Sequence, residues 1–261
     1  MSPEADLAFA QHLADVARGV TMAAFGQRLA VSRKYDNTIV TEIDAAAENA
    51  IRAVIAEHRP DDGVLGEEGG LAAGTSRRVW VIDPIDGTRM FAEGIPMWTT
   101  LVALKDETGT LVGIADAPAI TERCWATRGG GAWLQAGSAD PRQIHVSDVA
   151  SFADSFVLHA SVEEFTSTGH LDALLRLTTS TRGSRGLADA WAHTVVARGS
   201  AEAIIEAMEC HEWDWAATAL ILTEAGGEMT HWDGGDPTPG CRLIATNGLI
   251  TNDVFAAIRP R

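Results

Sequence analysis

The chain has 261 residues, which is enough for one large domain or two modest ones with a sizeable core. Hydrophobic residues make up 46% of it, so the chain is globular and not disordered. Its 36 acidic and 20 basic residues give a net charge of −16, which argues against a nucleic-acid surface because such surfaces depend on Lys and Arg. An anionic ligand would therefore need a positive partner.

No membrane association is expected, because no apolar run approaches the roughly 20 residues that span a bilayer. The N-terminal stretch MSPEADLAFAQHLADVA is acidic and amphipathic, unlike a signal peptide, and we expect a cytoplasmic protein. The cysteines, Cys124, Cys210 and Cys241, are few and widely spaced. They predict reduced thiols and neither a disulfide framework nor a zinc site.

The first part of the chain predicts two helices followed by a meandering sheet. Apolar residues recur at helical spacing over residues 4–25 and again over about 43–58, where Thr41 is a candidate cap. Pro60–Gly63 predicts a turn. Apolar runs separated by Gly or Pro predict the strands Val79–Ile82, Trp98–Lys105, Leu111–Ala117 and Arg123–Thr127, and a return strand after the glycines near 129–131.

The second part predicts alternating strands and helices, which is typical of an α/β layer. The predicted strands lie near 155–160, 203–206 and 243–245, and the predicted helices near 170–177, 188–198, 215–225 and 251–258. We therefore divide the chain into an N-terminal α+β part, residues 1–142, and a C-terminal α/β part, residues 143–261.

Residues 80–91, WVIDPIDGTRMF, place Asp83 and Asp86 three positions apart directly after a predicted buried strand. Like charges at this spacing repel, and burial strengthens the repulsion. Either solvent keeps the two carboxylates apart on a loop or a cation holds them together. Further acids beside apolar stretches are Asp44 in VTEID, Glu67 and Glu68 in VLGEEGG, and Asp214 in EWDWAA.

Each of these acids alone has a simpler interpretation. Asp44 and Asp214 could cap helices, GEEGG could be a solvated loop, and Arg77, Arg78 or Arg89 could pair with some of the carboxylates. Because the carboxylates outnumber the nearby basic residues, binding of a hard cation explains them better than ion pairs do. Mg²⁺ is such a cation and prefers oxygen ligands. The backbone carbonyl of Ile85, after the rigid Pro84, could join the same ligand shell.

Gly87 and Thr88 follow the aspartates and predict a glycine at a loop apex, then a short helical turn. Backbone N–H groups in such a turn bind phosphate oxygens. The same dozen residues thus predict cation ligands beside an anion cradle, and the cation would supply the missing positive charge. This combination suits hydrolysis of a phosphate ester by metal-activated water.

VTEID, GEE, VIDPIDGT and WDWAATALILTEAGGEMT, in this order, resemble the inositol monophosphatase superfamily over roughly residues 5–258. The resemblance implies Mg²⁺-dependent phosphatase activity, a layered α/β/α/β/α sandwich and a homodimer. It implies that Glu67, Asp83 and the carbonyl of Ile85 bind one metal, and that Asp83, Asp86 and Asp214 bind a second. Glu67 would also contact a third, weaker metal.

The resemblance also implies the catalytic and phosphate-binding residues. Thr88, with Asp44 behind it, would orient and activate the attacking water. The amides of Gly87 and Thr88, next to Asp86, would hold the phosphate. Glu68 matches the second acid of the GEE motif, beside the metal ligand.

The segment Arg185–Trp191 bears on the substrate. Inositol enzymes tend to have a small Gly-Ser/Thr-Ala segment here, whereas histidinol-phosphate phosphatases tend to have Arg, then Gly-Asp and an aromatic residue, which Asp189 matches. A carboxylate suits a substrate that carries a primary ammonium. Arg185, Asp189, Asp214 and Glu206 would contact the substrate, with Glu209 as the alternative to Glu206.

The sequence thus favours histidinol phosphate as the substrate. Inositol phosphate, or another cyclitol or sugar phosphate, is the first alternative. The second alternative is a metal-binding regulatory or scaffold protein with a vestigial site. The presence of all the acidic residues of the family motifs argues against this alternative.

Overall fold

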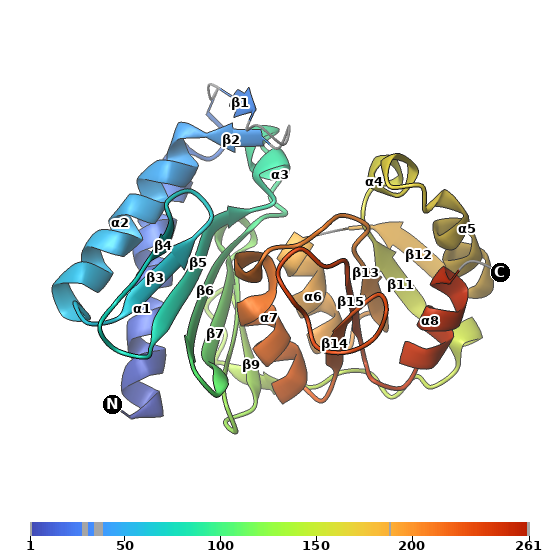
Figure 1. The fold of residues 1–261 in the computed structure, drawn as a ribbon. Coiled ribbons are helices and arrows are strands. Elements are labelled where there is room, and N and C mark those ends of the chain that lie inside the picture. Colours follow the sequence, from blue (N-terminus) through green and yellow to red (C-terminus); the bar gives the residue numbers. More distant parts are fainter. Residues whose placement is uncertain (1, 28–30, 34–38, 188, 260–261) are drawn as a thin grey trace.

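The computed structural model describes residues 2–27, 31–33, 39–187 and 189–259, which form alternating layers of helices and sheets (Figure 1). Helices α1 (Pro3–Ala24) and α2 (Glu42–His58) cover the outer face of an eight-stranded sheet. Helices α6 (Asp189–Ala197) and α7 (Glu212–Glu224) lie between this sheet and a five-stranded sheet. Helices α5 (Leu171–Ser180) and α8 (Thr251–Ile258) cover the far side. The layered α/β class is confirmed.

The large sheet has the strand order β10-β9-β8-β7-β6-β5-β3-β4. Its strands are β3 (Gly63–Gly66), β4 (Gly70–Ala72), β5 (Val79–Asp86), β6 (Thr99–Asp106), β7 (Gly109–Ala117), β8 (Glu122–Thr127), β9 (Ala132–Ala136) and β10 (Arg142–Ile144). Strand β5 pairs in parallel with β3 and antiparallel with β6. A separate antiparallel pair is formed by β1 (Val31–Arg33) and β2 (Ile39–Thr41).

The smaller sheet has the order β12-β11-β13-β15-β14. Its strands are β11 (Phe156–His159), β12 (Gly183–Gly186), β13 (Ala203–Ile205), β14 (Glu228–His231) and β15 (Leu243–Thr246). The short helices are α3 (Thr88–Ala92), α4 (Val162–Ser167), η1 (Pro118–Ile120) and η2 (Phe152–Asp154). Strand β11 is parallel to both of its neighbours, whereas β15 is antiparallel to β13 and β14.

Helix α7 is apolar on most of its surface because it is packed on both sides. Ala217, Leu220 and Ile221 are buried in a core cluster that includes Leu101 of the large sheet and Ile204 of the small one. A helix that is apolar all round is typical of such a central layer. At Gly113 a side chain cannot be accommodated, since a Cβ there would lie 2.4 Å from the backbone oxygen of Ala217.

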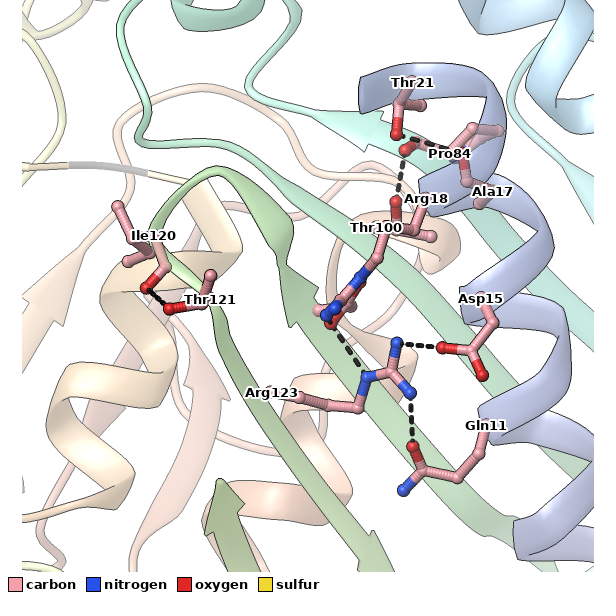
Figure 2. Close-up of polar contacts among 11 residues, drawn as sticks. Gln11, Asp15, Ala17, Arg18, Thr21, Pro84, Thr100, Ile120, Thr121 and Arg123 are labelled. Carbon is pink, nitrogen blue, oxygen red and sulfur yellow. Dashed lines mark hydrogen bonds and ion pairs between the residues drawn. The ribbon is translucent and has the colours of Figure 1, made fainter. Parts of the chain in front are cut away.

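Helix α1 is held to the large sheet by a charge network around one buried aspartate (Figure 2). Asp116 is fully buried and accepts hydrogen bonds from Arg18 Nε at 3.0 Å and Arg123 Nε at 2.8 Å. Arg123 also donates to Gln11 and Asp15, both at 2.7 Å. Buried charge is tolerated when it is paired in this way, so Asp116 has a structural role.

The predicted helices and the predicted strands are confirmed, with ends that differ by up to four residues. The elements that were not predicted are helix α4 and strands β1, β2, β3, β4, β10, β12 and β14. The side chain of Thr41, the candidate cap of α2, lies outside the described side chains. The division of the chain near residue 142 stays a prediction. Over the described residues, no helix is long and apolar enough to cross a membrane.

Candidate active site

Asp83 and Asp86 lie on either side of a bulge at the end of β5. Asp83 pairs with Leu101 and Asp86 with Thr99, so two residues of β5 lie opposite one residue of β6. The hydroxyl of that residue, Thr100, donates to the carbonyl of Pro84 at 2.7 Å, as Figure 2 shows. Proline fits a bulge because it has no N–H to pair. The bulge therefore presents both carboxylates from one short segment.

Asp214 reaches the same place from the first turn of α7. Its Oδ2 accepts the N–H of His211 at 2.6 Å, which fixes the side chain at the start of the helix. Oxygens of Asp83, Asp86 and Asp214 all lie within 4.8 Å of one another. Three carboxylate oxygens at this separation can ligate one cation.

The charges of this cluster also favour the binding of a cation. Burial and then the charge of Glu67 raise the pKa of Asp83, and burial and then the charge of Asp189 raise the pKa of Asp86. Burial, with Glu67 as the main neighbouring charge, raises the pKa of Asp214 to about 8. Proximity of like charges and loss of water both disfavour the charged forms. The all-oxygen donor set therefore fits a hard divalent ion such as Mg²⁺.

Glu67 lies in the turn between β3 and β4, and a buried carboxylate of α2 shapes this turn. Glu48 accepts the N–H groups of Glu68 at 2.8 Å and Gly69 at 2.7 Å, and Arg52 Nε at 2.7 Å. Glu48 is 1% exposed. Its carboxylate leaves no room for a side chain at position 66, where a Cβ would lie 2.6 Å from it.

Thr88 and Asp44 are in direct contact, as the sequence led us to expect. The Thr88 hydroxyl lies 3.1 Å from Asp44 Oδ1 and 3.0 Å from the carbonyl oxygen of Ile85. Asp44 is 1% exposed in the first turn of α2, so it lies behind Thr88. Gly87 precedes α3 in the left-handed conformation, with φ +84°, which glycine adopts without strain.

One cavity of about 660 Å³ joins these groups to the C-terminal part of the chain. On the N-terminal side it is lined by Glu67, Asp83, Ile85, Asp86, Gly87, Thr88, Arg89 and Met90. On the C-terminal side it is lined by residues of segments 161–164, 186–193 and 206–214. Arg89 is exposed and pairs with Glu163 at 3.3 Å. It is the sole Arg or Lys among the described lining residues.

The C-terminal wall carries Asp189, Glu206 and Glu164. Asp189 begins α6 with φ +63°, and burial together with the charge of Glu206 raises its pKa to about 7. The next amide, of Ala190, donates to Asp86 Oδ2 at 2.7 Å, so the start of α6 is tied to the carboxylate cluster. This acidic wall faces the same space as the cluster.

The other predicted substrate residues lie in different surroundings. Glu206 is 6% exposed and lines the cavity, and Glu209 lines it from an exposed position. Arg185 does not line it: this exposed residue extends over the ring of Phe156, with its guanidinium 6.0 Å from the ring centre.

Sequence reasoning missed Glu164 and His193, which both line the cavity. Ser161-Val-Glu-Glu164 has the spacing of a capping box after a strand, and this could have placed Glu164 at the start of a helix. His193 follows Asp189 by four residues on α6, and residues at this spacing share a helix face. Neither signal by itself indicates a cavity.

The family model for the inositol monophosphatase family matches residues 2–259. The chain belongs to the inositol monophosphatase family. It is therefore a phosphatase of a metal-dependent family, and the acidic cluster described above could hold the metal.

Proteins similar to this chain include two that are named histidinol-phosphatase. The protein of that name from Streptomyces coelicolor is 39% identical, covering 98% of this chain and 97% of the relative. The one from Mycobacterium tuberculosis is 36% identical and covers 97% of each chain. Among solved structures, an IMPase from Thermotoga maritima matches with a TM-score of 0.86 and 29% identity, covering 98% of this chain and 97% of that one.

Proposed function

We propose that this protein is a Mg²⁺-dependent phosphomonoesterase that hydrolyses histidinol phosphate to histidinol and phosphate. The observation that supports the proposal most is that acidic residues line one cavity on two sides. The cluster of Asp83, Asp86 and Asp214 suits a metal, and the wall of Glu164, Asp189 and Glu206 suits a positive charge on the substrate. The histidinol-phosphatases among its relatives support the same substrate.

Glu67, Asp83, Asp86, Asp214 and the carbonyl of Ile85 would hold Mg²⁺. The bound ion would neutralise phosphate charge and lower the pKa of a coordinated water. The chain's own contribution is to keep these oxygens in place, through the bulge of β5, the Glu48-supported turn and the first turn of α7.

Thr88 would accept a proton from the attacking water and pass its own hydroxyl proton to the carboxylate of Asp44. The hydroxyl has a single hydrogen and two acceptors, Asp44 Oδ1 at 3.1 Å and the carbonyl oxygen of Ile85 at 3.0 Å. If the metal takes the Ile85 carbonyl, the hydrogen would go to the buried Asp44. A lone pair of Thr88 then faces the water. The amides of Gly87 and Thr88, where α3 begins, would hold the phosphate oxygens.

The primary ammonium of histidinol would bind on the acidic wall. Asp189 has a pKa of about 7, so an approaching ammonium would favour its charged form. Arg185 would contribute less to substrate binding, because its exposed side chain lies on the ring of Phe156. The homodimer and the cytoplasmic location expected from the sequence also belong to the proposal, and size-exclusion chromatography with light scattering tests the first.

The test is phosphate release with Mg²⁺ from histidinol phosphate and from inositol 1-phosphate, each with and without a chelator. We expect strong preference for histidinol phosphate and loss of turnover with the chelator. Preference for inositol 1-phosphate would mean that the proposed substrate is wrong and that the proposed phosphatase chemistry still holds. Turnover that persists in the chelator would contradict the metal assignment.

A further inference from the structure

Two buried polar atoms on the C-terminal wall of the cavity have no hydrogen-bond partner. One is Oε1 of Glu206, which directly follows β13, and the other is Nε2 of His193 on α6. Glu206 is 6% exposed and His193 is 3% exposed, and both line the cavity. The two atoms are 3.6 Å apart, which is too far for a hydrogen bond between them. Unpaired buried polar atoms are costly, so these two require a partner.

The hydrogen bonds of the His193 ring indicate that its unpaired nitrogen is an acceptor. Nδ1 lies 2.9 Å from the hydroxyl oxygen of Thr218. That hydroxyl donates its hydrogen to the carbonyl of Trp215, at 3.3 Å. With the hydroxyl hydrogen on the Trp215 carbonyl, we assign the ring proton to Nδ1, which then donates to the Thr218 oxygen. In a neutral imidazole with Nδ1–H, the atom Nε2 is an acceptor.

Two acceptors thus face each other across a gap that a donor can fill. A primary ammonium has several N–H groups, and its nitrogen can lie about 2.9 Å from both atoms. A hydroxyl has a single hydrogen and can satisfy only one of them. The pair therefore discriminates between an amine and an alcohol at the same position of a substrate.

We propose that Glu206 and His193 form the subsite for the primary ammonium of an amino-alcohol phosphate. This inference rests on the proposed phosphatase function and adds a specificity pair to it. Glu164 strengthens the preference for a cation: it lines the same cavity, and burial followed by the charge of Glu206 raises its pKa. One Glu164 oxygen accepts the hydroxyl of Ser161 at 3.0 Å, which holds this carboxylate in place.

The test compares esters that differ only by the amine, in the wild type and in Glu206→Gln. Histidinol phosphate is paired with 3-(imidazol-4-yl)propyl phosphate, which keeps the ring and the phosphate and lacks the amino group. We expect Glu206→Gln to raise KM at least about tenfold for the amine ester, because a charge-assisted hydrogen bond is lost. KM for the analogue should change less than about twofold.

A second variant tests His193 without altering the cavity wall. Thr218→Val removes the partner of Nδ1, so the ring can place its proton on Nε2 and donate it to Glu206. We expect this variant to lose the same preference for the amine ester. Calorimetric binding of free histidinol should weaken in both variants, independently of turnover. The matched control is Glu163→Gln, a carboxylate on α4 that is exposed, which should keep the wild-type ratio of KM values.

The inference is overturned if Glu206→Gln changes KM for both esters by the same factor, or if the wild type does not distinguish them. A failed substrate assignment gives a different result, namely no Mg²⁺-dependent release of phosphate from histidinol phosphate. In that case, KM values for 2-aminoethyl phosphate and ethyl phosphate are compared instead, since these esters also differ by the amine and have no imidazole.

Discussion

Asp83 is the side chain on which the candidate metal site depends most. It is 2% exposed, and its Oδ1 accepts the N–H of Ile85 at 3.0 Å within the bulge. It lies among Glu67, Asp86 and Asp214, whose charges raise its pKa together with burial. A cation that relieves this repulsion converts a destabilising arrangement into a binding site.

We predict that Asp83→Asn lowers kcat at least about 100-fold and weakens Mg²⁺ binding. Mutation of residues that only support metal ligands already lowers metal affinity or activity about 10–100-fold. The same substitution should raise the Tm of the metal-free protein, since it removes one of several repelling carboxylates. Enzyme assays, calorimetric Mg²⁺ titration and thermal denaturation check the three parts. Near-normal activity would refute the assignment of Asp83 as a ligand.

Asp189 lies on the C-terminal wall of the same cavity, where we propose that the substrate binds. We predict that Asp189→Ala lowers kcat/KM for histidinol phosphate at least about tenfold more than for 4-nitrophenyl phosphate, because only the first ester carries an ammonium. Steady-state kinetics on both esters check this. Equal losses would mean that Asp189 acts only through its neighbours at the start of α6.

Helix α2 serves the site in two ways from adjacent turns. Asp44 contacts Thr88, and Glu48, four residues later, binds the turn that carries Glu67. Residues four apart share a helix face, so one straight helix fixes both groups relative to each other. Arg52 continues the same face and compensates the buried charge of Glu48.

We predict that Glu48→Gln weakens Mg²⁺ binding about tenfold and lowers the Tm, while kcat at saturating Mg²⁺ is largely kept. The amide retains one acceptor oxygen and cannot accept both backbone N–H groups and Arg52. Calorimetric titration of Mg²⁺ and thermal denaturation measure the two effects. Glu57→Gln, an exposed position on α2, is the matched control. Unchanged Mg²⁺ affinity would show that the turn holds its shape without Glu48.

Much of this architecture could be predicted because the strands and helices near the site have strong apolar periodicity. The strand was expected at Val79–Ile82 and the helix near 215–225, whereas the structure extends β5 to Asp86 and begins α7 at Glu212. Strands β3 and β4 are short and rich in Gly, so their sequence lacks a strand signal. Glu164 and His193 reach the cavity only through packing of α4 and α6 against their neighbours, which no local pattern encodes.

The molecule brings its carboxylates together from distant parts of the chain. Asp83 and Asp86 belong to the large sheet, whereas Asp214 belongs to the helix layer between the sheets. The packing that joins these layers therefore also forces like charges into contact. Folding without a cation is opposed by this repulsion, and the opposition depends on pH.

We predict that the metal-free protein loses stability as pH rises from about 4 to about 8. The folded-state pKa of Asp214 is about 8 against an ordinary 3.8, so in this window the folded state retains a proton that the unfolded state releases. Stability must then fall with rising pH. Between pH 6 and pH 8 we expect a loss of at least about 1 kcal/mol, or about 2–4 °C in Tm for a chain of this size.

Thermal denaturation in chelator at both pH values checks this prediction, and Mg²⁺ should restore the Tm at pH 8 more than at pH 6. The variant Asp214→Asn should flatten the pH dependence in chelator. A metal-free Tm that rises or stays constant from pH 6 to pH 8 would contradict the electrostatic account.

The hydrogen bond from the Ala190 amide to Asp86 has a consequence for how such enzymes diverge. In the proposed function, phosphate chemistry would depend on β5, α2 and α7, whereas discrimination among substrates would depend on α4, α6 and the end of β13. Descendants of one ancestral gene can therefore acquire new substrates by mutating the second group alone. The start of α6 is the exception: its backbone at Ala190 is bonded to a metal-cluster carboxylate at 2.7 Å. Selection can replace side chains there, but the path of the main chain must be inherited unchanged.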